Sequence, residues 1–285
     1  MILIADSGST KTDWLLVHLT NNTLVTTSGI NAYYMSSEMI LGMLRKELQP
    51  LVPSNQVDKI YFYGSGCSTE SKCYKISSIL KELFVNATIE VNHDMLAAAR
   101  SLCKDETGIA SILGTGSNSC VYDGKKITQQ MVSLGYFFGD EGSGTHLGKL
   151  LITDYLRGEM PAELSAKLNT EFNLSLELVL DNIYNQGPPN KFLASFAPFI
   201  QKNAQDLYVR QLVAKSFIDF LKVGIMKFSG FENLKVSFVG SIAFHFQDIL
   251  KEVALANGIR IEKIQKSVIE GLRDYHLSRH TSAKI

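Results

Sequence analysis

The fold is decided by the opening stretch of the chain, Met1-Ile-Leu-Ile-Ala-Asp-Ser-Gly-Ser-Thr-Lys-Thr-Asp-Trp14. Its apolar run is too short for a helix and predicts a strand, and the small hydroxyl residues around Gly8 predict a tight turn before a second strand. Such a turn can bind a polyphosphate, because glycine allows close approach of the backbone and hydroxyl groups donate hydrogen bonds. An ordinary hairpin turn explains the stretch equally well, since short turns of this composition are common.

The side chains of this turn also suit a magnesium nucleotide. Ser9, Thr10 and Thr12 offer hydroxyl donors, Lys11 adds positive charge, and Asp6 can hold Mg²⁺ through water. The sequence therefore offers a candidate phosphate loop between its first two predicted strands.

The composition is that of a globular protein without a strongly charged partner. The chain has 285 residues, of which 45% are apolar and 20% charged, and its formal net charge is zero. This length predicts about two domains, and the charge balance gives no reason to expect nucleic acid or a membrane surface as a partner. The four cysteines form no C-x-x-C pair and fit no zinc pattern. With neither a signal peptide nor a membrane span recognisable, we expect a cytoplasmic protein with reduced thiols.

The pattern of strand, glycine-rich turn and strand returns in the middle of the chain. Residues 108–113 predict a buried strand, Gly114-Thr-Gly-Ser-Asn-Ser119 a second turn rich in hydroxyl groups, and residues 120–122 the next strand. A repeat of this kind predicts two related domains that face one another.

Asp94 is the carboxylate that the local pattern places best for catalysis. Residues 88–91 predict a strand and residues 95–102 an alanine-rich helix, so Asp94 lies where open α/β sheets bind their ligands, at the carboxyl end of a strand. An ordinary N-cap explains the same position equally well. We expect its neighbour His93 to be structural.

Further strands and helices alternate along the chain. A turn rich in glycine carries Asp140 and Glu141, but its glycines do not form the dinucleotide fingerprint, which excludes an NAD site. Gly240-Ser241 ends a buried strand, where the backbone could receive a flat ring or a phosphate, or simply make a packing turn. We expect strands at 23–27, 59–63, 234–239 and 259–261, and helices at 36–48, 71–84, 149–156, 162–172, 176–185, 189–203, 206–228, 242–257 and 267–278.

Four motifs along the chain resemble, in the same order, the phosphate and adenosine motifs of the actin-like ATPase superfamily, which also contains hexokinase and Hsp70. The chain is most similar to the N-acetylglucosamine kinase branch, grouped with the BadF/BcrA-type ATPases. This resemblance implies an α/β fold of two RNase H-like domains, residues 1–106 and 107–285, with the active-site cleft between them. The last helix, at about 267–285, is expected to pack back on the first domain. The motifs are Asp6-Ser-Gly-Ser-Thr-Lys-Thr12, Leu113-Gly-Thr-Gly-Ser-Asn118, Gly139-Asp-Glu-Gly-Ser143 and Val239-Gly-Ser-Ile-Ala243.

The resemblance also implies a role for individual residues. Asp94 matches the catalytic base, with Asp140 as the competitor for that role within the chain. Before the Gly139-Asp140 motif the family tends to carry a tryptophan that helps to hold the N-acetyl group, and here Ser133-Leu134-Gly135 occupies that stretch. The nucleotide ligands are expected to be Ser9, Thr10, Lys11, Gly114, Thr115, Gly116, Ala197, Gly240 and Ser241, the sugar ligands Asn31, Asp94, Ser133, Leu134, Gly135 and Asp140, and the magnesium ligand Asp6.

The chemistry of a sugar kinase fits these roles. A sugar hydroxyl is a poor nucleophile, so a carboxylate must orient it and accept its proton while Mg²⁺ and hydrogen-bond donors hold the transferred phosphoryl group. We therefore expect phosphorylation of an N-acetylated amino sugar, N-acetylglucosamine or N-acetylmuramic acid, at its 6-hydroxyl, with ATP and Mg²⁺ as cofactors. The process served would be amino-sugar or cell-wall salvage, and we expect a homodimer.

Two other functions are compatible with the same motifs. One is the ATPase activator of a 2-hydroxyacyl-CoA dehydratase or reductase, which needs cysteine ligands for an iron–sulfur cluster shared by two subunits. Cys67 and Cys103 are the pair whose spacing comes nearest to this requirement. The other is a sugar or nucleotide sensor without catalysis, although no helix-turn-helix precedes the first predicted strand.

Overall fold

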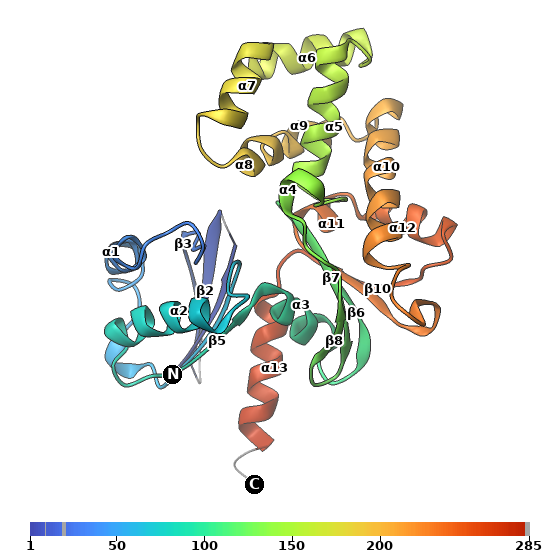
Figure 1. The fold of residues 1–285 in the computed structure, drawn as a ribbon. Coiled ribbons are helices and arrows are strands. Elements are labelled where there is room, and N and C mark those ends of the chain that lie inside the picture. The colour runs from blue at the N-terminus through green and yellow to red at the C-terminus, as the bar shows by residue number, and fades with distance from the viewer. Residues whose placement is uncertain (9, 19–20, 283–285) are drawn as a thin grey trace. The chain divides into compact units, whose positions relative to one another are not determined.

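The computed structural model describes residues 1–8, 10–18 and 21–282. The chain packs as two compact units, one formed by Met1–Lys104 together with the segment that begins at Val268, and the other by Asp105–Ser267. Each unit contains one five-stranded sheet. Helices accompany the sheet in both units (Figure 1). The expected α/β class is therefore confirmed. Within the described residues, no helix is both long and apolar enough to cross a membrane.

The first unit is built on a sheet with the strand order β3-β2-β1-β4-β5. The strands β1, β4 and β5 are parallel, while β2 runs antiparallel to both β1 and β3. Ser7 pairs with Gly64 and Gly64 with His93, so the three parallel strands end at the same level. Their bounds are β1 (Ile2–Ser7), β2 (Lys11–Val17), β3 (Asn22–Ser28), β4 (Lys59–Gly64) and β5 (Thr88–His93).

The sheet of the second unit repeats this topology, with the order β8-β7-β6-β9-β10. Here β6, β9 and β10 are parallel, and β7 is antiparallel to both β6 and β8. The two strand-turn-strand motifs thus open two sheets of the same construction, as the repeat in the sequence predicts. The strands are β6 (Thr107–Leu113), β7 (Ser117–Asp123), β8 (Ile127–Gln130), β9 (Val236–Val239) and β10 (Ile261–Gln265).

In the first unit the core forms around Trp14 and Phe62, both fully buried, whose ring centroids lie 5.7 Å apart. The indole N–H of Trp14 donates to the hydroxyl of Thr27 at 3.0 Å, which satisfies its one polar group. Ser36 caps the first helix, as the sequence predicts, by accepting a hydrogen bond from the Met39 amide. The helices before the second unit are α1 (Ser37–Glu47), η1 (Ser54–Gln56), α2 (Glu70–Leu83) and α3 (Asp94–Cys103).

The C-terminal helix α13 (Ile269–Ser282) belongs to the first unit and packs on α3 (Figure 1). A Cβ atom added at Gly271 would lie 2.1 Å from the hydroxyl oxygen of Ser101, so the two helices meet where only glycine fits. His276 of α13 is buried and its Nε2 lies 2.8 Å from the Tyr63 hydroxyl. The helix therefore contacts both α3 and β4.

The helices of the second unit follow the predicted sequence of segments but are divided more finely. They are α4 (Gly135–Phe138), α5 (Gly144–Arg157), α6 (Ala162–Phe172), α7 (Leu176–Tyr184), α8 (Pro189–Ala194), α9 (Ala197–Lys202), α10 (Leu207–Gly224), η2 (Phe231–Asn233), α11 (Ser241–His245) and α12 (Gln247–Ala256).

Several predicted boundaries in this unit are wrong. The helix predicted over 189–203 breaks at residues 195–196, because Pro198 near the start of α9 has no N–H that could donate to the Ala194 carbonyl. The helix predicted over 242–257 breaks at buried Phe246. The edge strand begins at Ile261 and not at Ile259. The Ile259 amide instead donates a hydrogen bond to the Ala254 carbonyl at the end of α12. Neither β8 nor α4 was among the predicted segments.

Candidate active site

The predicted site residues lie in both units. In the first unit, Asp6 lies near the end of β1 and Asp94 opens α3 directly after β5. Burial raises the pKa of Asp6 to about 7, and the negative charge of Asp94 is the next largest cause. Two carboxylates influence each other in this way only when they are close, so the edge formed by the parallel strands brings them together.

Asp94 is not needed to cap its helix. The N-cap is His93, whose ring Nδ1 accepts a hydrogen bond from the Leu96 amide at 3.3 Å, as expected for a structural histidine. The Asp94 carboxylate accepts instead from the Met95 amide at 2.8 Å. Burial raises the pKa of Asp94 to about 6, against the lowering effect of the backbone N–H groups of Met95 and of Asp94 itself. An acid with a pKa near neutrality suits proton transfer.

The first turn differs in part from the expected phosphate loop. Ser9 lies outside the described residues, and Thr10 is exposed, with its carbonyl accepting from the Gly29 amide at 3.2 Å. Lys11 forms an ion pair of 2.5 Å with Asp13, so part of its charge is already compensated. The expectation that Thr12 donates to a ligand is wrong, because its buried hydroxyl bonds to Ser7 and to the Ser28 carbonyl.

Asn31 lies against a turn that the sequence did not identify as part of the site. Gly66, just after β4, has φ +81°, and a Cβ atom added to it would lie 2.9 Å from the Asn31 Oδ1. The next residue, Cys67, is buried, and the charge of Asp94 helps to raise the pKa of its thiol to about 12, after burial and Cys73. The turn after β4 therefore contacts Asn31 on one side and lies within the electrostatic influence of Asp94. Two glycines directly after a strand of the parallel edge were the signal for this turn.

In the second unit, the turn Gly114–Gly116 is tied to the start of α5. The Gly144 amide donates to the Gly114 carbonyl at 2.8 Å, and the Thr145 hydroxyl donates to the Thr115 carbonyl at 2.6 Å. Among the residues that the structure describes, none accepts a hydrogen bond from the amide of Thr115 or Gly116. Free amides in a glycine turn are what an anion-binding nest offers.

Asp140 packs on the same turn. Its Oδ1 accepts from the Ser117 amide at 3.1 Å and would lie 2.9 Å from a Cβ atom added at Gly116. Asp140 itself has a positive φ of 61°, and burial raises the pKa of its carboxyl, with Glu141 adding to this effect. The structure thus places Asp140 beside the predicted phosphate turn, where one of its oxygens is used to hold the turn.

Gly240 also touches this turn through its backbone. It has φ +122°, and an added Cβ atom would lie 2.3 Å from the Leu113 carbonyl oxygen. Ser241 opens α11 and Ala197 opens α9. Gln201 and His245, each four residues further on, are hydrogen-bonded at 3.0 Å, so the C-terminal ends of these two short helices come together. The residues predicted for the adenosine pocket therefore come from neighbouring elements.

The stretch that occupies the place of the family tryptophan is exposed. Leu134 is 56% exposed, and Gly135, with φ +64°, begins the short helix α4. Ser133 precedes them on the surface. The helix presents Phe137 and Phe138 to the surface, and the sequence analysis did not single out these two aromatic residues.

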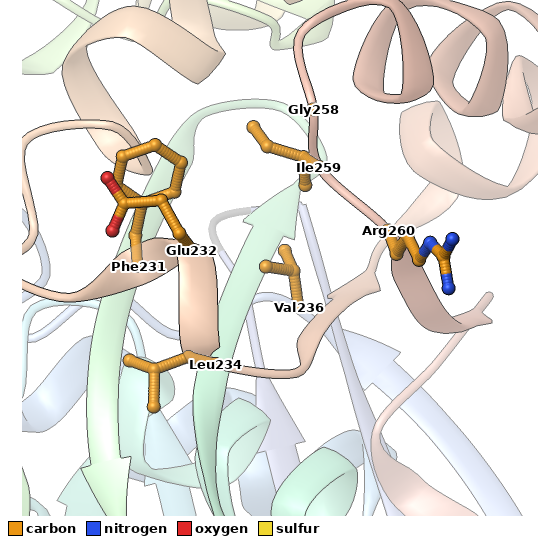
Figure 2. A pocket seen from close by; sticks show the side chains of 7 residues that line it. All are labelled: Phe231, Glu232, Leu234, Val236, Gly258, Ile259 and Arg260. Carbon is orange, nitrogen blue, oxygen red and sulfur yellow. The ribbon is translucent and has the colours of Figure 1, made fainter.

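A cavity of about 310 Å³ elsewhere in the second unit is not the candidate site. It is lined by apolar residues such as Val236 and Ile259, together with Glu232 and Arg260 (Figure 2). Val236 begins β9, so the cavity lies at the amino end of this strand, whereas Gly240 follows its carboxyl end. Open α/β sheets bind ligands at the carboxyl ends of their strands.

Solved structures identify the class of fold. A non-polymerising mutant of MamK bound to AMPPNP has a TM-score of 0.52 at 11% identity and covers 95% of both chains. A protein from Chromobacterium violaceum, provisionally named an N-acetylglucosamine kinase, has a TM-score of 0.67 at 18% identity, covering 95% of this chain and 96% of that one. The chain thus has the two-unit fold of the actin-like ATPases.

A third structure identifies the family. It is a protein from Porphyromonas gingivalis, also provisionally named an N-acetylglucosamine kinase, with 40% identity and a TM-score of 0.94 over 98% of this chain and 100% of that one. The chain therefore belongs to the N-acetylglucosamine kinase-like family of the actin-like ATPase superfamily. No protein-family model and no curated protein matches it.

Proposed function

We propose that this protein transfers the terminal phosphoryl group of ATP to the 6-hydroxyl of an N-acetylated amino sugar, either N-acetylglucosamine or N-acetylmuramic acid. The similarity to proteins provisionally named N-acetylglucosamine kinases supports phosphoryl transfer to an amino sugar as the class of reaction. The main observation behind the proposal is that Asp94 lies at the carboxyl edge of a parallel sheet, where burial raises its pKa to about 6. No capping role accounts for it, since His93 caps the helix.

In this proposal Asp94 is the general base. It accepts a hydrogen bond from the sugar hydroxyl, orients the oxygen toward the phosphoryl group and takes the proton as the new bond forms. With a pKa of about 6, the carboxylate is mostly ionised at neutral pH and is more basic than an exposed aspartate. Proton transfer of this kind contributes roughly 10²–10⁴-fold to the rate.

The surroundings of Asp6 fit a magnesium ion. Asp6 is half-buried near the negative charges of Asp94 and Asp13, and the nearby Lys11 is already paired with Asp13. Within the described residues, no group of three acidic, histidine or cysteine side chains could hold a metal. Mg²⁺ is commonly bound through one or two carboxylates with waters and substrate phosphates, so Asp6 alone is a sufficient protein ligand. When bound, the ion neutralises charge on the phosphoryl group that is transferred.

The second unit supplies nucleotide ligands in this proposal. The amides of Thr115 and Gly116 face no protein acceptor among the described residues and can donate to phosphate oxygens. Gly240 brings the backbone after β9 against this turn, and Ala197 at the start of α9 and Ser241 at the start of α11 would contact the adenosine. Asn31 in the first unit and Asp140 in the second would bind sugar hydroxyl groups.

A coupled assay of ADP release tests the proposal. ATP and Mg²⁺ are supplied with N-acetylglucosamine, N-acetylmuramic acid, glucosamine, N-acetylmannosamine, glucose or no sugar, and ³¹P NMR locates the phosphate on the product. We expect turnover with an N-acetylated amino sugar, a 6-phosphate product and no turnover after chelation of Mg²⁺. ADP release that does not depend on sugar would contradict a kinase, as would the absence of release with every sugar.

A further inference from the structure

Two lysines of α2 converge on the turn that follows Asn31. The ammonium groups of Lys72 and Lys75 both donate to the carbonyl oxygen of Ala32, each at 3.3 Å. Lys75 also donates to the Met35 carbonyl. Since both cations bond to one oxygen atom, they lie close together and repel each other.

The negative charge around these lysines does not balance them. Lys75 lies near the carboxylate of Glu38, whose pKa it helps to lower. Among the described residues, no carboxylate forms an ion pair with Lys72. Its ammonium group lies instead over the ring of Tyr33, 4.7 Å from the centroid. Within the described residues, the positive charge of Lys72 is therefore not neutralised by an ion pair and is available to an anion.

Hydroxyl groups complete an anion-binding arrangement beside Lys72. The Tyr33 hydroxyl lies 2.8 Å from the Ser68 hydroxyl, and either can donate. Because one of the two hydroxyl protons is used in this bond, Lys72, Tyr33 and Ser68, here called the Lys72 cluster, combine one cation with one hydroxyl group that can donate to a ligand. A carboxylate is well matched to such a set because it accepts several hydrogen bonds and gains from the charge.

The Lys72 cluster adjoins the proposed sugar ligand. A Cβ atom added at Gly66 would lie 2.9 Å from both the Asn31 Oδ1 and the ring of Tyr33, so these two side chains meet at one glycine. Ser68 follows two residues later, and the intervening Cys67 is close enough to Asp94 for that charge to raise its pKa. A sugar that reaches Asn31 and Asp94 would therefore have the Lys72 cluster at its side.

We propose that the Lys72 cluster binds a carboxylate carried by the amino sugar and so selects an acidic substrate. This inference rests on the proposed kinase function and deepens it. Of the two candidate sugars, N-acetylmuramic acid has such a group on its lactyl ether, and N-acetylglucosamine has none. Lys72 is then the residue that distinguishes them.

The test compares the free acid of N-acetylmuramic acid with its methyl ester, which removes the charge and changes little else. For the wild-type protein we expect kcat/KM to be roughly 10–100-fold higher for the acid, the effect of a charged hydrogen bond. In Lys72→Met this preference should disappear, mainly through a higher KM for the acid. Lys81→Met is the matched control, since Lys81 also lies on α2 and donates to a carbonyl oxygen, that of Ala87 at 2.9 Å.

Each outcome bears on one of the two claims. Equal kcat/KM for acid and ester in the wild-type protein would overturn the inference while leaving the kinase function intact, and this comparison requires no variant to fold. An acid preference that survives in Lys72→Met, or is lost equally in Lys81→Met, would also overturn it. If neither these sugars nor N-acetylglucosamine is phosphorylated, the proposed function fails and the inference fails with it.

Discussion

The carboxylate of Asp94 raises the pKa of Asp6, although the two residues belong to different strand-turn segments of the first unit. Their meeting follows from the register of the sheet, in which β1, β4 and β5 end at the same level. Two acids held near each other where both are half-buried favour a bound cation and make one of them more basic. These are the two needs of phosphoryl transfer to a hydroxyl group.

The pH profile should report the ionisation of Asp94. A general base must be unprotonated, so kcat/KM should be constant above about pH 7 and fall about tenfold per unit below pH 6, where Asp94 takes up its proton. The measurement is the coupled assay between pH 5 and 8.5 at saturating Mg²⁺, with the coupling enzymes in excess at each pH. A profile that stays flat down to pH 5 would show that no group with this pKa acts as the base.

Replacing Gly240 should damage nucleotide binding specifically. In Gly240→Ala the new methyl group would collide with the Leu113 carbonyl and displace the turn that follows it. We expect ATP affinity to fall at least tenfold, as measured by calorimetry with a non-hydrolysable analogue. Gly258→Ala is the control, because Gly258 also has a positive φ, +75°, but open space around it. That variant should lose only about 1 kcal/mol of stability from backbone strain and keep its affinity.

Gly66 should matter for the sugar and not for ATP. An alanine there would press on the Asn31 side chain and would be strained at φ +81°. We expect the KM for sugar to rise roughly tenfold or more in Gly66→Ala, while the dissociation constant of the ATP analogue stays within about twofold. Equal losses for both ligands would instead indicate general unfolding of the first unit, and an unchanged KM would remove Asn31 and Gly66 from the site.

His146 should make the second unit sensitive to acid. It is buried, with Nδ1 2.8 Å from the Ser216 hydroxyl, and burial lowers its pKa from 6.5 to about 4. Below pH 6.5 the imidazole therefore takes up a proton in the unfolded chain but stays neutral in the folded protein. The contribution of His146 to the free energy of unfolding is complete above pH 6.5 and is lost progressively toward pH 4, by about 3 kcal/mol in total.

The comparison that isolates this effect is the pH dependence of thermal unfolding in the wild-type protein and in His146→Gln. Asp6 and Asp94, whose raised pKa values act in the opposite direction, are present in both proteins and cancel. The midpoint of the variant should fall less between pH 7 and 5. Parallel curves would mean that His146 is not protonated on unfolding.

Local patterns in the sequence predicted the parts of the fold that depend on neighbouring residues. The two strand-turn-strand motifs were visible because apolar runs end abruptly at Asp6 and Gly114, and each opens a sheet of the same topology. The position of Asp94 was predictable for the same reason, since a β-prone run meets an alanine-rich helix there.

Features that depend on tertiary contacts were not predictable. The approach of Lys72 to the Ala32 carbonyl joins two elements that are 40 residues apart, and no periodicity encodes it. The strand β8 has one half-buried apolar residue, Ile127, and is recognisable only by its pairing with β7. The break at Phe246 arises because that side chain is buried between two short helices, a matter of packing and not of helix propensity.

The most direct test of the central claim is the turnover of Asp94→Asn with the sugar that the wild-type protein phosphorylates. Asparagine keeps the size of the side chain but cannot accept the proton, so kcat should fall by roughly 10²–10⁴-fold while affinity for the ATP analogue stays nearly the same. Asp248→Asn, which removes an exposed acid from the first turn of α12, should retain full activity and controls for helix-end charge. Turnover of Asp94→Asn near the wild-type rate would contradict the assignment of Asp94 as the base.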